Sequence, residues 1–217
     1  MKLDQVLIVV PTHGEMEVIR RDFQGPGCKW VLCGVGPAKA ALETTTAILR
    51  NSPGLVVLAG ICGIFSRSRR RLGSLFMAQS ETYGDLGRCT VNGIEPIVIS
   101  GKRLESHFDL MPHISAFSLR PFLKHLDVTI GHMVTVSCTS NSEERPLLGS
   151  GTREYICENM EGAAVAQVCT SFGVPFLEIR AGSNFVGDQD LANWQIGPAL
   201  KKLAQVLGPL LEHVRMV

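Results

Sequence analysis

The feature that most constrains the fold is a regular alternation of short apolar runs with longer helical patterns. Several runs are apolar at consecutive positions, such as VLIVV at 6–10 and LVVLAG at 55–60. Strands read this way when helices cover both faces of their sheet. The alternation therefore predicts a mostly parallel sheet in a layered α/β sandwich.

The expected elements fill the chain without a linker or an internal repeat. Predicted strands span residues 5–11, 30–34, 55–60, 75–79, 96–100, 132–138, 155–160 and 175–180. Predicted helices lie near residues 14–23, 37–50, 161–172 and 195–214. Because 217 residues suit one α/β domain and are short for two, we expect a single domain over 1–217.

Charge and cysteine usage exclude several classes of protein. Lys and Arg total 21 and Asp and Glu total 20, so no net field draws the chain to nucleic acid or to an anionic membrane. The basic run Arg67, Arg69, Arg70 and Arg71 is interpreted as a solvated loop.

The seven cysteines lack a C-x-x-C pair, and Cys33, Cys62, Cys138 and Cys169 sit in apolar runs as small buried residues. This pattern favours a reducing compartment over a disulfide scaffold or a zinc site. The apolar stretch at 55–65 is shorter than the ~18 residues of a membrane span. We therefore expect a cytoplasmic protein without a metal.

Ligands of open α/β sheets bind at the carboxyl ends of strands, so the segments that follow strands are the candidate sites. Glu15 and Glu17 follow the first strand, in the first turn of a predicted helix, and are candidates for catalysis. The helix dipole stabilises a carboxylate at this position, so a role in stability alone would also explain them. The segment Gly34-Val35-Gly36 follows the second strand but lacks the third glycine of a dinucleotide fingerprint.

Three further segments carry chemistry. Cys62 and Gly63 end the third strand, where the backbone either lies against a ligand or makes a tight turn. Met160 and Glu161 begin a helix of small residues and suit the binding of a ribose. The carboxylate can accept hydrogen bonds from the ribose hydroxyls, while the thioether packs on the ring. Glu161 equally suits a helix N-cap. A Ser-Asn pair, at 183–184, offers a hydroxyl and an amide or simply turn chemistry.

Taken in order, these segments resemble the nucleoside phosphorylase and nucleosidase family, in particular the methylthioadenosine/S-adenosylhomocysteine nucleosidases. The segments are LIVVPTHGEMEV, CGVGPAKAA, VVLAGICGIF, ETYGDLG, ENMEGAAVAQVC and FLEIRAGSN. The final stretch, EIRAGSNFVGDQDLANW, looks like the futalosine hydrolases, which release hypoxanthine from a nucleoside of the alternative menaquinone pathway. The resemblance implies a three-layer α/β/α sandwich with a mixed, partly closed sheet, a homodimer or larger assembly, and hydrolysis without a cofactor.

The resemblance also implies roles around the sugar. Glu161 would hold the ribose hydroxyls and Met160 would pack against the ring. A carboxylate on the first helix would activate the water; Glu17 fits the family spacing best, with Glu15 as its competitor.

Around the base, the resemblance implies that the backbone at Cys62 and Gly63 would border the ring. Asn184, backed by Ser183, would stabilise the departing purine, and Arg180 would support this base-side loop.

The chain departs from the adenosine-type nucleosidases at three places. Asn184 replaces their aspartate, which argues for a 6-oxopurine base. Ile61-Cys62-Gly63-Ile64 replaces Ser-Ala-Gly-Gly, which argues against a phosphate nucleophile. No aromatic residue is found near 140–142 to stack on the base.

Four other readings stay open. They are a methylthioadenosine/S-adenosylhomocysteine nucleosidase, a purine nucleoside phosphorylase, a non-catalytic nucleoside-binding module and a dinucleotide-dependent oxidoreductase, which the incomplete glycine pattern disfavours. The apolar segment Phe108-Asp109-Leu110-Met111-Pro112 is interpreted either as an exposed segment that mediates self-association or as a loop with ordinary packing.

Overall fold

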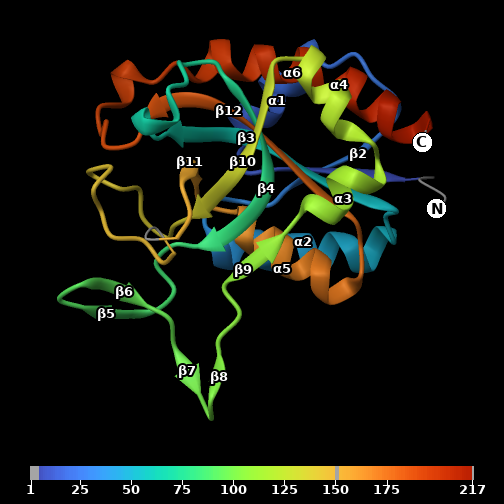
Figure 1. Cartoon of the computed structure of the whole chain (residues 1–217). Helices are drawn as coiled ribbons and strands as arrows, with labels where there is room; N and C mark the ends of the chain where they lie inside the picture. Colours follow the sequence, from blue (N-terminus) through green and yellow to red (C-terminus); the bar gives the residue numbers. More distant parts are fainter. Residues whose placement is uncertain (1–4, 150–151, 217) are drawn as a thin grey trace.

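One eight-stranded sheet organises this computed structural model, which describes residues 5–149 and 152–216 (Figure 1). Its strand order is β11-β10-β4-β12-β3-β1-β2, with β9 paired to β4. These strands are β1 (Val6–Val10), β2 (Lys29–Leu32), β3 (Leu55–Ile64), β4 (Leu75–Tyr83), β9 (His107–Asp109), β10 (Val128–Thr135), β11 (Tyr155–Asn159) and β12 (Phe176–Phe185).

The sheet closes on itself over part of its width. Strand β11 pairs parallel with β10 and antiparallel with β3, so β3, β12, β4, β10 and β11 form a ring. The pair β12–β4 is also antiparallel, whereas β1–β2, β1–β3, β3–β12 and β4–β10 are parallel. The mixed, partly closed sheet that the resemblance implies is thus confirmed.

Helices cover both faces because the strands are apolar on both. Along β1, Val6, Ile8 and Val10 join the core beneath α1 (His13–Asp22) and α6 (Ile196–Met216). Leu7 and Val9 point the other way, into the core beneath α2 (Pro37–Asn51) and α5 (Gly162–Phe172). Figure 1 shows these two helical layers with the sheet between them, so the predicted three-layer sandwich is confirmed.

Two strands continue past their predicted ends. We placed the ends of the third and last predicted strands at residues 60 and 180, but β3 reaches Ile64 and β12 reaches Phe185. The glycines at 60, 63 and 182 look like strand terminators, yet the ladder between β3 and β12 continues through them. These extra residues form part of the candidate site.

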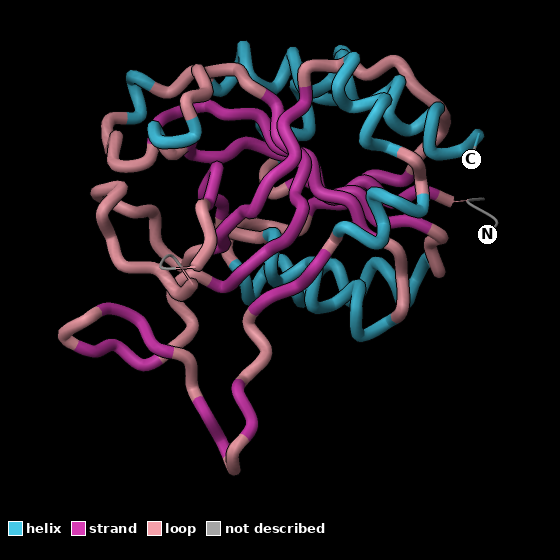
Figure 2. Tube along the Cα trace, viewed as in Figure 1, coloured by secondary structure: helices cyan, strands magenta, loops and turns pink. Residues whose placement is uncertain are grey.

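The segment between β4 and β10 differs most from prediction. Only one strand is predicted there, at 96–100, whereas the structure has two small hairpins that project from the body (Figure 2). They are β5 (Arg88–Thr90) with β6 (Gly93–Glu95) and β7 (Val98–Ile99) with β8 (Lys102–Arg103). Two short helices, α3 (Met111–Ala116) and α4 (Leu119–His125), follow β9 and were not predicted.

The interpretation of segment 108–112 as an exposed apolar segment is wrong. Phe108 and Leu110 are buried in the chain's own core, and the Phe108 ring packs edge-on against Tyr83. Strand β9 explains the burial of Phe108, which pairs with Glu81 of β4; Leu110 follows the strand, and its amide still donates to Gln79 O at 2.9 Å. A contact between copies therefore does not use these two side chains, although Asp109 and Pro112 of the same segment are exposed.

Other expectations about the surface can be checked directly. The basic run at 67–71 is exposed, as predicted. Cys33, Cys62 and Cys169 are buried as expected, but Cys138 is exposed because it lies in the loop after β10. Within the described ranges, no helix is long and apolar enough to cross a membrane.

Candidate active site

A cavity of about 200 Å³ lies where β1, β3, β11 and β12 meet the segments that follow them. Its walls include Pro11, Thr12, Glu15, Val35, Ile61, Cys62, Gly63, Thr139, Ser140, Glu158, Asn159, Met160, Glu161, Arg180, Ser183, Asn184, Gln189 and Trp194. Several of these residues are ionisable and buried, which is unusual unless such groups are paired.

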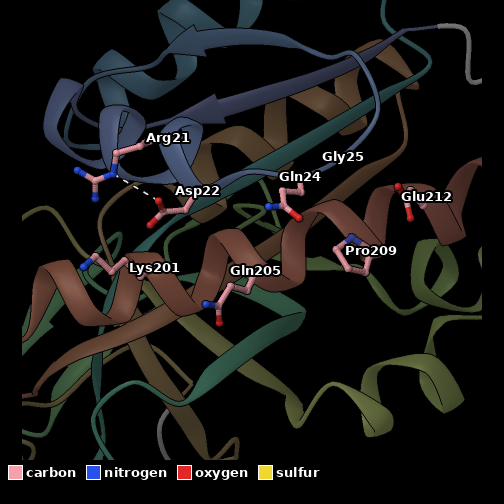
Figure 3. Close-up of a pocket in the computed structure, with 8 residues that line it drawn as sticks. All are labelled: Arg21, Asp22, Gln24, Gly25, Lys201, Gln205, Pro209 and Glu212. Carbon is pink, nitrogen blue, oxygen red and sulfur yellow. Dashed lines mark hydrogen bonds and ion pairs between the residues drawn. The ribbon is translucent and has the colours of Figure 1, made fainter.

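A larger hollow of about 1020 Å³ lies between α1 and α6 (Figure 3). Its walls carry Arg21, Asp22, Lys201, Gln205 and Glu212, and none of these side chains is buried. Size therefore does not locate the chemistry in this molecule. The smaller cavity is the candidate site because its polar groups are desolvated and converge.

The first helix sends Glu15, and not Glu17, into the cavity. Glu15 is 5% exposed; its Oε1 accepts from the Ile61 amide at 3.0 Å and its Oε2 from the Thr12 hydroxyl at 2.7 Å. Glu17 is exposed and faces a separate surface hollow beside His13 and Arg20. Two residues along a helix are about 200° apart around its axis, so the two carboxylates face opposite ways. The expectation that Glu17, rather than Glu15, lies at the site is therefore wrong.

The surroundings of Glu15 act on the pKa of its carboxyl group in both directions. Burial raises the pKa of Glu15, while hydrogen bonds from Thr12 and Ile61 and the charge of Arg180 act in the opposite direction. A carboxylate whose pKa is raised by desolvation holds a proton more readily than a solvated one. Glu15 thus has the environment expected of a general base.

Glu161 occupies the N-cap position of α5 but makes no capping hydrogen bond with its side chain. The Asn159 side chain does that instead, because its Oδ1 accepts from the amides of Glu161 at 2.9 Å and Gly162 at 2.7 Å. The Glu161 carboxylate is therefore free of the capping role and points into the cavity, next to Met160. It accepts from the Gly36 amide at 3.2 Å, which brings the Gly34-Val35-Gly36 loop to the same site.

Arg180 is buried among carboxylates. Its Nη1 lies 3.2 Å from Glu161 Oε2, and its Nε donates to Glu178 Oε1 at 2.8 Å. Burial lowers the pKa of the Arg180 guanidinium, but Glu178, Glu161 and Glu15 outweigh burial and raise it. The guanidinium stays charged and holds Glu161 in place.

Among the described residues, Arg180 makes no direct hydrogen bond to the Ser183–Asn184 pair through which it is expected to support the base-side loop. Within residues 5–149 and 152–216, the guanidinium donates to Glu178, Ile61 O and Asn159 and makes no hydrogen bond to Ser183 or Asn184. The guanidinium instead pairs with Glu178 and with Glu161, the residue expected to bind the sugar.

Ser183 and Asn184 form a second polar group in the cavity. The register of β12 against β3 shifts between Gly182 and Asn184, which is the mark of a β-bulge at Ser183. The Ser183 hydroxyl donates to Asn184 Oδ1 at 2.9 Å, and Asn184 Nδ2 donates to Phe185 O at 3.1 Å. Gly63 lies beside them, since a Cβ there would be 3.4 Å from Asn184 Nδ2.

Three buried carboxyls at or behind the site were not predicted: Glu81, Glu158 and Glu178. Glu81 accepts from Asn159 at 2.6 Å and from the Thr135 hydroxyl at 2.8 Å. Burial raises its pKa well above the usual range, and the charge of Glu178 raises it further. A charged residue inside an otherwise apolar strand, as in LFMAQSETY and FLEIRAG, is the signal that marks Glu81 and Glu178.

One aromatic side chain of the cavity was also left unassigned. Trp194 lines the cavity and donates its Nε1–H to Asp188 O at 3.1 Å. The stretch 140–142, where a stacking residue was sought, contributes Ser140 to the cavity, and Thr139 lines it just before. Residues 150 and 151 of the same loop lie outside the described residues. The described part of the chain has no group of three or more His, Cys, Asp or Glu residues arranged to hold a metal ion.

Comparisons with known proteins agree with this architecture. The phosphorylase superfamily model matches residues 4–213. A futalosine hydrolase of Streptomyces coelicolor is 34% identical, over 94% of each chain. A futalosine hydrolase of Thermus thermophilus is 30% identical, over 88% of this chain and 84% of the relative. A 5'-methylthioadenosine/S-adenosylhomocysteine nucleosidase of Geobacillus thermodenitrificans is 29% identical, over 84% and 78%.

The solved structures share the fold at lower identity. The native futalosine hydrolase of Helicobacter pylori superposes with a TM-score of 0.79 at 17% identity, covering 96% of this chain and 97% of that one. The methylthioadenosine/S-adenosylhomocysteine nucleosidase of the same organism also has a TM-score of 0.79 and covers 98% and 99%. With both the superfamily model and a full-length relative above 30% identity in agreement, the chain belongs to the phosphorylase superfamily and, within it, to the family of the futalosine hydrolases.

Proposed function

We propose that this chain hydrolyses the N-glycosidic bond of futalosine, releasing hypoxanthine and dehypoxanthine futalosine. The carrying observation is that buried Glu15 and Glu161 line one cavity with the Ser183–Asn184 pair. Futalosine is proposed as the substrate because two of the relatives are futalosine hydrolases. The proposal includes one domain over 1–217, no cofactor, a cytoplasmic place in the alternative menaquinone pathway and a homodimeric or larger assembly.

Glu15 takes the role of general base in this mechanism. Its carboxylate would accept a proton from the attacking water as the glycosidic bond to the base breaks and the ribosyl group becomes oxocarbenium-like. The Ile61 amide and the Thr12 hydroxyl hold both carboxylate oxygens, so the side chain is already oriented before substrate arrives.

Glu161 anchors the sugar. Its remaining lone pairs can accept hydrogen bonds from the two ribose hydroxyls, while Met160 offers an apolar contact to the ring. The ion pair with Arg180 fixes the position of the carboxylate. We therefore expect Glu161→Gln to weaken substrate binding and to slow turnover.

Asn184 receives the departing base. Hypoxanthine carries a carbonyl at position 6 beside N7, and an amide can donate to that oxygen while its own oxygen accepts from a protonated N7. The Ser183 hydroxyl already donates to Asn184 Oδ1, which fixes the amide; one N–H of Nδ2 donates to Phe185 O, and the other is left for the base. An ionised aspartate at this position would repel the 6-carbonyl and suit a 6-amino group instead.

The substitution Asn184→Asp tests this reading of the site. We expect the wild type to prefer futalosine over its 6-amino analogue, and the variant to lose activity on futalosine. Sites built on such pairing can discriminate by ~10⁴. The measurement is the ratio of kcat/KM for the two nucleosides in both proteins. If the ratio is the same in the wild type and the variant, Asn184 does not read the base.

A methylthioadenosine/S-adenosylhomocysteine nucleosidase is the second candidate, because several relatives near 29% identity carry that name. Asn184 argues against it for the reason just given. A panel of futalosine, inosine, methylthioadenosine and S-adenosylhomocysteine, with release of free base as the readout, separates the candidates. Cleavage of the adenine nucleosides alone would favour the second.

A further inference from the structure

Glu158, Gly63 and Asn184 form a row across three neighbouring strands. Glu158 of β11 is the partner of Gly63 in the antiparallel β11–β3 pair, and Asn184 of β12 is the partner of Gly63 in the β12–β3 pair. Side chains of directly paired residues lie on the same face of a sheet. The carboxylate and the amide therefore flank Gly63 on one face, and all three residues line the cavity.

Gly63 leaves a gap in the middle of this row. A Cβ at Gly63 would lie 3.3 Å from Val186 Cγ2 and 3.4 Å from Asn184 Nδ2, so a side chain there would crowd the amide. Neighbouring strands are about 4.8 Å apart, which separates the backbones of Glu158 and Asn184 by roughly 10 Å. A flat heterocycle over Gly63 would thus have a polar side chain at each of two edges.

Glu158 is a buried hydrogen-bond acceptor with capacity to spare. It is 6% exposed, and its Oε1 accepts from the Ser140 amide at 2.9 Å. The second oxygen is hydrogen-bonded to the Ser140 hydroxyl. A carboxylate has about four lone-pair sites, so two remain for a ligand. Nothing in the proposed hydrolysis uses this side chain.

The surroundings of Glu158 include one positive and one negative group. Arg145 Nη1 donates to Cys138 O at 2.7 Å and to the Ser140 hydroxyl at 3.4 Å, and its Nη2 lies 3.4 Å from Asp85. Burial raises the pKa of Glu158, the two hydrogen bonds from Ser140 and the charge of Arg145 lower it, and Asp85 raises it. The carboxyl oxygens can accept a hydrogen bond in either form, and in the ionised form they can only accept, so this edge suits a ligand that presents a donor.

We propose that Glu158 is a second base-reading residue, which accepts the N1–H of a 6-oxopurine while Asn184 binds the edge with O6 and N7. This inference rests on the proposed function and names the group that the site reads. Hypoxanthine has a hydrogen on N1, whereas adenine has a lone pair there that an ionised carboxylate repels. Two side chains, and not one, then select the 6-oxo base.

Binding of the free bases tests the proposal without relying on catalysis. Isothermal titration calorimetry with hypoxanthine and adenine is run on the wild type and on Glu158→Gln. The glutamine can donate to the adenine N1, and it removes a charge-assisted hydrogen bond to hypoxanthine. We expect the ratio of the two affinities to fall by tenfold or more.

Two controls separate base reading from a structural tie between β11 and the Ser140 loop. Ser140→Ala removes the hydroxyl bond of that tie and keeps both the amide bond and the carboxylate, so it should leave the ratio of affinities unchanged. Glu143→Gln alters a similar contact outside the cavity, where Glu143 accepts from the Ser66 amide and hydroxyl. It should change neither affinity nor ratio. If Glu158→Gln does not fold, as judged by circular dichroism, Glu158→Asp withdraws the carboxylate by one methylene and is expected to lower the same ratio.

Equal weakening of both bases in the folded Glu158 variant, matched by Ser140→Ala, would overturn the proposal. So would a wild type that fails to bind hypoxanthine more tightly than adenine. The proposed function fails separately: a protein that selects hypoxanthine through Glu158 but does not cleave futalosine would refute the hydrolysis and leave the base reading standing.

Discussion

Glu15 and Glu17 stand two positions apart in α1, yet only Glu15 enters the cavity. A general base contributes ~10²–10⁴ in rate. We therefore expect Glu15→Gln to lower kcat by that order while the protein stays folded. The matched variant Glu17→Gln changes an exposed side chain on the opposite side of the same helix. Steady-state kinetics on both proteins settles the assignment, and a crippled Glu17→Gln beside a normal Glu15→Gln would reverse it.

The ionisation of Glu15 also predicts how the rate depends on pH. Burial raises the pKa of Glu15 above its usual value of 4.5, with Thr12, Ile61 and Arg180 opposing and Glu161 adding to the rise. A base must be unprotonated, so kcat/KM should fall as the pH drops through the raised pKa and should level off above it. The measurement is kcat/KM for futalosine across a range of pH. If kcat/KM falls only at or below the pKa of a free glutamic acid, the raised pKa of Glu15 is contradicted.

Sequence reasoning located those site residues that directly follow the predicted strands. Met160, Glu161, Ser183 and Asn184 all line the cavity, because the ends of neighbouring strands meet at one edge. Glu158 was passed over because its relevance comes from pairing with Gly63, a contact across 95 positions of sequence that no local pattern records. The error over Glu17 has a different cause: family spacing was preferred to the helical phase that the residues themselves define.

At the scale of elements, helix α5 can begin where it does only because its first residue is glycine. A Cβ at Gly162 would press on the carboxyl oxygens of Glu81 and Glu178. These groups cannot easily retreat, because Glu81 is held by Thr135 and Asn159 and Glu178 by Arg180. Position 162 thus couples the start of the helix to the buried network behind the site.

We expect Gly162→Ala to reduce the free energy of unfolding by ~1–3 kcal/mol, the usual cost of overpacking a core. Gly14→Ala is the matched control, since a Cβ at Gly14 in α1 would meet no atom within 4 Å. It should be neutral or slightly stabilising, because alanine favours a helix over glycine. Urea denaturation of both variants gives the comparison. Equal stabilities would show that the network yields to an added methyl group.

Element prediction succeeded where periodicity was long and failed where it was short. The four long helices were placed within a few residues of their ends; α2, α5 and α6 bury a face over several turns, and α1 buries Ile19 in a partial stripe. Strands β3 and β12 were cut short because glycine was read as a terminator. The projecting hairpins β5–β6 and β7–β8 are two or three residues per strand, too short for any period to be visible.

At the scale of the whole molecule, the chain has two cores on either side of one sheet and a cavity where the sheet closes. Closure brings β11 against β3, which places Glu158 and Glu161 beside the residues of β3 and β12. A pattern of strands and helices predicts the layers but not this closure, since the antiparallel β11–β3 pair joins distant segments. The resemblance to a known family supplied what periodicity could not.

Self-association is a prediction of the same scale. We expect a homodimer or a larger assembly, through surfaces other than the side chains of Phe108 and Leu110, which are buried within the chain. Sedimentation velocity at several protein concentrations measures the molar mass, against 23.6 kDa for one chain. A species that stays at the mass of one chain and retains full activity would exclude the assembly.

The most direct test of the account is incubation of the purified protein with futalosine in a phosphate-free buffer, followed by chromatography of the products. The account predicts equal amounts of hypoxanthine and dehypoxanthine futalosine, at a rate that added phosphate does not change. Ile61 offers no side-chain donor to a phosphate, and the exposed basic run at 67–71 does not line the cavity. Release of hypoxanthine only when phosphate is present, or no cleavage of futalosine by a folded protein, would contradict it.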